Sequence, residues 1–99
     1  FPSALKNYLE AICCVGLTFY YDENELPQTL SRGKKLYYVS TGGGELNKQF
    51  GFEYVKALFG EFFHIEDVKG FFAEKLDLRG SDPSRILDNA LSEIDQYFA

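Results

Sequence analysis

Apolar residues near the start of the chain recur at the spacing of one face of an α-helix: Leu5, Leu9, Ile12 and Cys13. The pattern predicts an amphipathic helix from Ser3 to about Val15. Ser3 is a residue type that caps helix N-termini, and Gly16 is one that ends helices, so both bounds have a local signal.

Residues 16–33 mix aromatic side chains with Asp, Asn, Glu and Pro and close on Gly33. This composition predicts a long connection with one extended stretch at Thr18–Tyr21. Connections of this length are uncommon in compact domains and often carry function.

Two short apolar runs predict strands, at Lys35–Ser40 and at Asp67–Glu74. The first run is continuous and does not alternate with polar residues. Such a run is typical of a strand covered on both faces in a parallel sheet.

Two more helices are predicted, one from Leu46 to about Phe59 and one after residue 82. Gly51 weakens the first turn of the former, so that helix is expected to start late. In the latter, Asp82 is the expected N-cap and Pro83 the first helical residue. The apolar faces are Phe52, Val55, Phe59 and Phe62 in one helix, and Leu87, Leu91, Ile94 and Phe98 in the other.

The predicted order is helix, loop, strand, helix, strand, helix, which indicates an α/β fold with right-handed crossovers and a parallel sheet. Two parallel strands leave a sheet edge unpaired, and parallel strands are normally buried. We therefore expect residues 1–99 to be one part of a larger doubly wound domain, and the chain begins at Phe1 on a helix where a strand is expected before it.

The composition narrows the function. With 15 acidic and 10 basic residues the net charge is −5, which disfavours nucleic acid as a partner. Apolar runs stay far below the roughly 20 residues of a membrane span, so no membrane role is predicted. Cys13 and Cys14 are adjacent, which implies neither a disulfide nor a metal site and favours a reducing cytoplasm.

The run Ser40–Gly44 follows a predicted strand and precedes a helix, the position where open α/β sheets bind ligands. Glycines there remove Cβ atoms and permit positive φ, so a flat ring could approach the backbone. The spacing matches neither the dinucleotide fingerprint nor a P-loop. On residue type alone, a turn that simply needs glycine explains the run equally well.

Other chemistry is less well supported. His64 is the only histidine, and without an acid and nucleophile pattern around it we expect a structural or surface role. Lys34 and Lys35 are expected to face solvent. The acidic residues of the long connection are expected to form a solvated turn: Asp22, Glu23 and Glu25. Metal-ligand spacing is absent from the sequence.

Taken together, FPSALKNYLEAICCVGLTFYY, GKKLYYVSTGGG, FGEFFHIEDVKGFFAE and the last helix resemble, in order and spacing, one known family. It is the C-terminal half of the flavodoxin-like FMN-dependent NADH:quinone oxidoreductases and azoreductases. The resemblance implies a homodimer with FMN at the carboxyl edge of a five-stranded parallel sheet. It also implies two-electron ping-pong transfer from NADH or NADPH to a quinone or azo compound.

The resemblance assigns roles to individual positions. Tyr21 and Phe62 match aromatics that stack on a flat acceptor, Phe62 toward the partner subunit's flavin. No catalytic side chain and no metal is implied. The hydroxyl-rich loop that grips the FMN phosphate lies outside these residues, so the isolated chain is predicted to be inactive. The residues that match the loop beside the flavin ring are Ser40, Thr41, Gly42 and Gly43.

Two alternatives remain open. The unpaired sheet edge is compatible with a non-enzymatic α/β interaction domain that pairs this edge with another chain. Some relatives also carry an acyl-carrier-protein phosphodiesterase label, but no nucleophile or metal cluster supports hydrolysis here.

Overall fold

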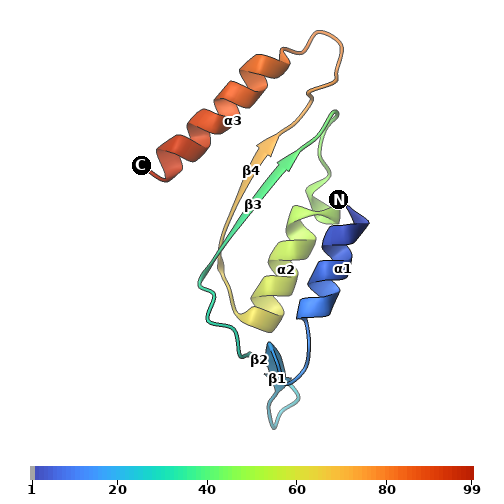
Figure 1. The fold of residues 1–99 in the computed structure, drawn as a ribbon, viewed down its shortest axis with the longest axis vertical. Coiled ribbons are helices and arrows are strands. Elements are labelled where there is room, and N and C mark those ends of the chain that lie inside the picture. Colours follow the sequence, from blue (N-terminus) through green and yellow to red (C-terminus); the bar gives the residue numbers. More distant parts are fainter. Residues whose placement is uncertain (1) are drawn as a thin grey trace. The chain divides into compact units, whose positions relative to one another are not determined.

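The computed structural model describes residues 2–99 (Figure 1). Their elements, in chain order, are α1 Ser3–Ile12, β1 Phe19–Tyr21, β2 Pro27–Thr29, β3 Lys35–Thr41, the 3-10 helix η1 Lys48–Phe50, α2 Phe52–Phe63, β4 Asp67–Ala73 and α3 Pro83–Tyr97. The chain forms two compact units. Unit 1 contains the residues through Leu36 together with Lys48–Val68, and unit 2 contains Tyr37–Asn47 and Lys69–Ala99.

The N-termini of α1 and α3 are built differently. The N-cap of α1 is Pro2, without a side-chain hydrogen bond, and Ser3 is already helical, so the prediction of a Ser3 cap is wrong. Asp82 caps α3 as predicted, because its carboxylate accepts the backbone N–H of Arg85 at 3.2 Å. Pro83 occupies the first turn, where the lack of an N–H costs no hydrogen bond.

Helix α1 ends at Ile12, earlier than the predicted end near Val15. The cause is Thr18, whose hydroxyl donates to the Ile12 carbonyl and accepts the N–H of Cys14 at 3.1 Å. This contact turns the chain away from the helix axis. Gly16, expected at the helix end, lies in the following turn with φ of +85°.

The connection after α1 contains a β-hairpin. Its first strand, β1, confirms the extended stretch predicted at Thr18–Tyr21, whereas β2 was not predicted. The strands are antiparallel and pair as Phe19 with Thr29, Tyr20 with Gln28 and Tyr21 with Pro27. Proline is tolerated because the hairpin is only two strands wide and has free edges.

Helix α2 supplies much of the apolar core of unit 1. It starts late, after Gly51, as predicted, but it ends at Phe63 and not at Phe59. His64 then adopts a left-handed conformation, with φ of 54°, and its N–H bonds to the Phe59 carbonyl. The buried side chains of unit 1 are Leu9, Phe19, Val55, Phe63 and Ile65.

Strands β3 and β4 form a two-stranded parallel sheet (Figure 1), which confirms the α/β class and the strand positions. In β4, Phe71 and Ala73 are buried. In β3, exposure alternates along the strand and no residue is buried, so the predicted cover on both faces is not present in the described chain. Val39 is 65% exposed.

Aromatic contacts hold the end of α3 to the sheet of unit 2. The Tyr37 ring lies 4.9 Å from Phe98 and 5.9 Å from Tyr97. The Lys69 ammonium lies 5.4 Å above the Phe71 ring and 3.4 Å from the Glu93 carboxylate. The predicted apolar stripe of α3 is only partly covered, since none of its residues is buried.

Among the described residues, no helix has the length and apolar character to cross a membrane.

Candidate functional site

The glycine run forms a loop at the carboxyl end of β3. We call Gly42–Leu46 the glycine loop and Ala73–Asp77, at the carboxyl end of β4, the return segment. Four backbone hydrogen bonds join them: Gly42 N–H to Ala73 O at 2.9 Å, Lys75 N–H to Gly44 O at 2.9 Å, Leu76 N–H to Gly42 O at 3.2 Å, and Asp77 N–H to Gly43 O at 2.9 Å. The three glycine carbonyls are therefore all used within the protein.

At two of these positions a side chain in place of glycine would displace a neighbouring side chain. A Cβ on Gly42 would lie 2.5 Å from Leu46 Cδ2, and a Cβ on Gly43 would lie 3.0 Å from Asp77 Cγ. Around Gly44 there is open space. None of the three has a positive φ, so the expected left-handed conformation is not present. The atoms that a Cβ would meet belong to side chains of the protein itself, Leu46 and Asp77.

A carboxylate closes the far end of the glycine loop. Glu74 Oε2 accepts the backbone N–H of Leu46 at 3.0 Å. Glu74 is half-buried and follows β4 directly. Neither Glu74 nor Asp77 was identified from the sequence, where the only signal is an acidic residue just past a strand.

Three successive backbone donors in the loop have no acceptor within residues 2–99: the N–H groups of Gly43, Gly44 and Glu45. Gly44 and Glu45 are exposed, so water accepts from these donors in the free chain, and a ligand edge rich in carbonyl oxygens or ring nitrogens can take the place of that water. The carboxylates of Glu74 and Asp77 beside it disfavour a phosphate at this point.

Ser40 and Thr41 complete the predicted ligand-binding stretch. They are the last two residues of β3 and lead directly into Gly42. Ser40 is half-buried and Thr41 exposed, and neither hydroxyl makes a hydrogen bond within the part of the chain that the structure describes. The structure thus places Ser40, Thr41, Gly42 and Gly43 in one continuous segment of unit 2, from the end of β3 into the glycine loop.

The two predicted acceptor-stacking aromatics lie in unit 1 and share one neighbour. Tyr21, from β1, meets the Phe19 ring edge-on at 5.5 Å, and Phe62, from α2, meets it at 4.8 Å. Phe19 is buried, whereas Tyr21 is 52% exposed. The structure therefore groups these two aromatics with each other, in a unit separate from the glycine loop.

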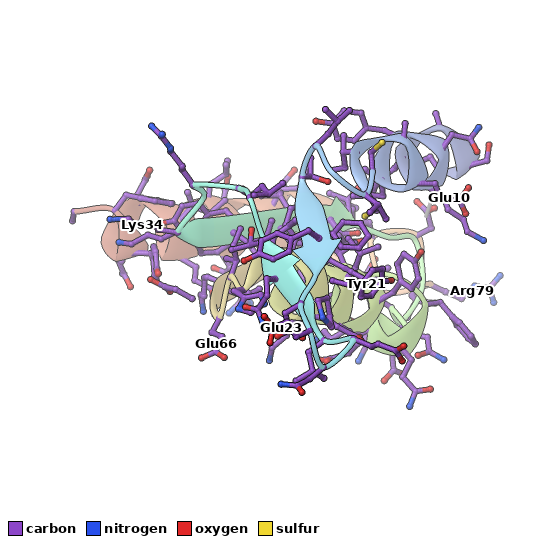
Figure 2. The ribbon with its side chains drawn as sticks, turned by 90° about the horizontal axis from the view of Figure 1, so that it is seen from below. Glu10, Tyr21, Glu23, Lys34, Glu66 and Arg79 are labelled. Carbon is purple, nitrogen blue, oxygen red and sulfur yellow. The ribbon has the colours of Figure 1, made fainter. Side chains whose placement is uncertain are left out.

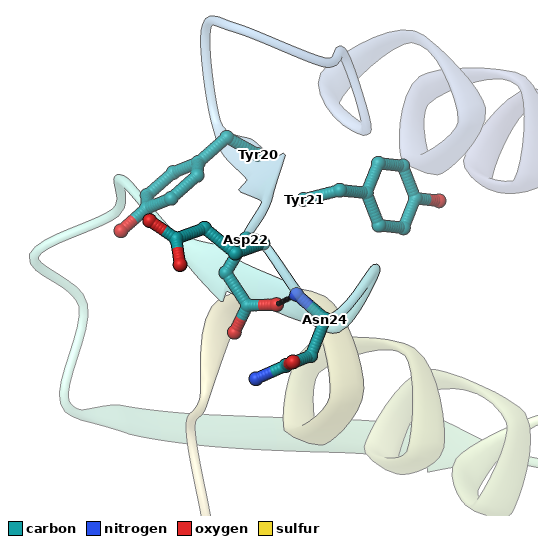
Figure 3. A pocket seen from close by; sticks show the side chains of 5 residues that line it. Tyr20, Tyr21, Asp22 and Asn24 are labelled. Atoms are coloured by element: carbon teal, nitrogen blue, oxygen red, sulfur yellow. Dashed lines mark hydrogen bonds between the residues drawn. The ribbon is translucent and has the colours of Figure 1, made fainter.

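The acidic residues of the connection form the turn between β1 and β2, as predicted. Asp22 accepts the N–H group of Asn24 at 2.9 Å (Figure 3). It also accepts the Leu26 N–H at 3.0 Å and the Gln28 side-chain amide at 2.9 Å. The Leu26 N–H, with smaller help from Gln28 and Asn24, holds the pKa of Asp22 below its ordinary value against partial desolvation. A hollow of about 500 Å³ beside the turn is lined by Tyr20, Tyr21, Asp22, Glu23 and Asn24.

The remaining polar candidates are structural or solvent-facing. His64 is exposed, and its Nε2 lies 2.9 Å from the Pro27 carbonyl, which confirms a structural role. Lys34 is exposed as predicted, and Glu66 points outward as well (Figure 2). No group of three or more His, Cys, Asp or Glu side chains among the described residues could hold a metal ion.

Comparisons with known proteins agree with this architecture. A profile of the flavodoxin-like fold matches residues 1–98. An FMN-dependent NADH:quinone oxidoreductase 2 from Clostridium acetobutylicum is 40% identical over 99 residues, which cover 94% of this chain and 48% of that protein. An FMN-dependent NADH:quinone oxidoreductase from Coprothermobacter proteolyticus is 35% identical, over 96% of this chain and 49% of that protein.

A solved structure is also similar. It is an FMN-dependent NADH-azoreductase from Bacillus anthracis in complex with FMN, with a TM-score of 0.81 and 27% identity. The match covers 98% of this chain and 48% of the azoreductase. The chain spans about half the length of each of these relatives. On the match over residues 1–98, the chain belongs to the flavodoxin-like fold family, within which it is similar to FMN-dependent NADH:quinone oxidoreductases and azoreductases.

Proposed function

We propose that this chain is about half of an FMN-dependent NAD(P)H oxidoreductase that reduces quinones or azo compounds. The observation that carries the proposal is the glycine loop, with three successive unused N–H donors at the carboxyl end of a parallel strand. The relatives support the choice of ligand, since their names specify FMN, NADH and quinone or azo chemistry.

In this proposal the glycine loop holds the edge of the flavin ring. The N–H groups of Gly43 and its two successors donate to ring acceptors, and the Ser40 and Thr41 hydroxyls offer further donors at the same edge. When bound, FMN supplies the two-electron chemistry, in a ping-pong cycle fed by NADH or NADPH. The protein needs no side chain that gains or loses a proton, and its task is to bind, orient and exclude water.

Tyr21 and Phe62 are proposed to stack on the flat acceptor. Offset or edge-on stacking between aromatic rings contributes about 0.5–1.5 kcal/mol beyond buried area, enough to orient a quinone or azo compound. Tyr21 is half-exposed and therefore accessible. A homodimer, in which Phe62 serves the partner subunit's flavin, is part of the same proposal, and a cytoplasmic location stays a prediction from the sequence.

A complete flavin site is proposed to need residues beyond these 99. The parallel sheet within residues 2–99 has two strands, and the acidic return segment beside the glycine loop does not suit a phosphate. The FMN phosphate would then be held by the half of the domain that the longer relatives have in addition to the half matched by these 99 residues. We expect the isolated chain to bind FMN weakly and to be inactive.

One experiment tests the proposal. FMN is titrated, with quenching of flavin fluorescence as the readout, into the 99-residue chain and into the full-length protein that carries it, followed by NADH oxidation with a quinone and an azo dye. Micromolar or tighter binding by the full-length protein, with turnover of either acceptor, supports the proposal. Absence of FMN binding to both proteins contradicts the proposal.

The second candidate is an interaction domain that pairs its open sheet edge with another chain. The observation in its favour is β3, which has no buried residue and exposes 65% of Val39. A folded, strictly monomeric 99-residue species in sedimentation would argue against it, whereas self-association without FMN binding would favour it.

A further inference from the structure

The contact between Glu74 and the glycine loop connects parts of the chain that are 28 positions apart. Glu74 Oε2 accepts the Leu46 N–H at 3.0 Å, and the side chain is half-buried at the carboxyl end of β4. Because the Glu74 side chain is half-buried, water competes less for this hydrogen bond than it would at an exposed position. This contact therefore restrains the end of the glycine loop directly.

The contact completes a closed frame around the three unused donors. At the start of the loop, Gly42 N–H bonds to Ala73 O, and the carbonyls of residues 42–44 bond to the N–H groups of residues 75–77. At the end of the loop, Leu46 N–H bonds to Glu74. Only the donors between these points, on Gly43, Gly44 and Glu45, stay unused within residues 2–99.

We propose that Glu74 is a positioning residue for the flavin ring: its carboxylate fixes the glycine loop so that the three N–H groups are preorganised for the ring edge. This inference rests on the proposed function. Preorganisation raises affinity because the ligand does not have to order the loop on binding. Without the carboxylate, the loop would sample other conformations and Leu46 N–H would turn to water.

The proposal assigns the effect to the acceptor oxygen and not to the negative charge. Glu74→Gln keeps an oxygen acceptor at the same distance from the backbone, whereas Glu74→Ala removes it. Glu66→Ala is the matched control, because Glu66 is an exposed glutamate that lies outside the glycine loop and the return segment. All variants are made in the full-length protein.

Three measurements are made on each variant: hydrogen exchange of the Leu46 amide, the Kd for FMN by fluorescence quenching, and the thermal unfolding midpoint. For Glu74→Ala we expect Leu46 exchange to rise and FMN affinity to fall roughly tenfold, the size expected for the loss of one hydrogen bond that orders the loop. Glu74→Gln should restore affinity to within about threefold of wild type, and Glu66→Ala should leave both readouts unchanged.

The outcomes separate this inference from the proposed function. If Glu74→Ala binds FMN as tightly as Glu66→Ala, or if Glu74→Gln binds as weakly as Glu74→Ala, the positioning role is overturned while the flavoenzyme stands. If wild type does not bind FMN, both are overturned. Should Glu74→Ala fail to fold, Glu74→Asp, with a carboxylate one methylene shorter, replaces it, and wild-type affinity in that variant overturns the inference.

Discussion

Two loops of this chain, the hairpin turn Asp22–Leu26 and the glycine loop Gly42–Leu46, differ in where the acceptors for their backbone N–H groups come from. In the hairpin turn, one carboxylate four residues or fewer away accepts two backbone N–H groups. In the glycine loop, the partners come from the return segment about 30 positions along the chain, and three N–H groups stay unused within residues 2–99.

The comparison shows why a hollow is a poor guide to the site in this chain. The hollow of about 500 Å³ beside the hairpin turn is lined partly by Asp22, whose carboxylate is already occupied by the N–H groups of Asn24 and Leu26 and by the Gln28 amide. The glycine loop combines a tight frame with unsatisfied donors. Unsatisfied backbone donors on a rigid frame are the property that a ligand can use.

The largest effect is expected from Gly42→Ala. The new Cβ would lie 2.5 Å from Leu46 Cδ2 and 3.1 Å from Leu46 Cγ, so the half-buried Leu46 side chain must move, at a cost of about 1–3 kcal/mol in unfolding free energy. Gly44→Ala is the matched control, since nothing lies within 4 Å of its Cβ position. Its effect should stay within about 0.5 kcal/mol.

Urea unfolding of the full-length protein measures both glycine variants. The gain from restricting the unfolded chain is the same for each Gly→Ala change, so it cancels in the difference. Equal stability of the two variants would show that the glycine loop is not held tightly. It would contradict the view that contacts with the return segment fix this loop.

A smaller effect is expected from Asp82→Ala at the N-terminus of α3. Here too a carboxylate accepts a backbone N–H, that of Arg85 at 3.2 Å, but this contact lies outside the glycine loop and the return segment. Loss of an N-cap costs about 1 kcal/mol. Unfolding should therefore be easier while FMN affinity stays unchanged, and a fall in affinity equal to that of Glu74→Ala would mean that stability alone controls FMN binding.

The smallest effect concerns Asp22, because the hairpin turn is exposed. The pKa of Asp22 is lowered in the folded state, chiefly by the Leu26 N–H, so its stabilisation is complete above the ordinary pKa of about 3.9 and is lost as pH falls through the lower, folded-state value. Asp22→Asn should lack this part of the acid dependence. Urea midpoints for both proteins between about pH 6 and pH 2.5 measure it, and parallel curves would contradict the assignment.

Elements with local signals were predictable from the sequence, and elements set by distant contacts were not. Strand β3 and helix α3 begin where predicted, because a continuous apolar run and an Asp-Pro start act within a few residues. The end of α1 was wrong because the Thr18 hydroxyl reaches back to the Ile12 carbonyl. Strand β2 was missed because Pro27 is typical of a loop.

The candidate site was predictable in position but not in mechanism. Ser40, Thr41, Gly42 and Gly43 do lie together at the carboxyl end of β3, but Gly42 and Gly43 do not have a positive φ, and a Cβ there would instead meet the side chains of Leu46 and Asp77. Glu74 could not be assigned, since its bond to Leu46 exists only once two strands have aligned in a sheet. Hydrogen-bond partners of this kind depend on register, which a single sequence does not specify.

The most direct test of the central claim is a backbone amide NMR titration of the full-length protein with FMN. We predict that the N–H signals of Gly43, Gly44 and Glu45 shift on binding, while those of Asn24 and Leu26, whose donors already bond to Asp22, do not. FMN binding that leaves the three loop signals in place would contradict the account.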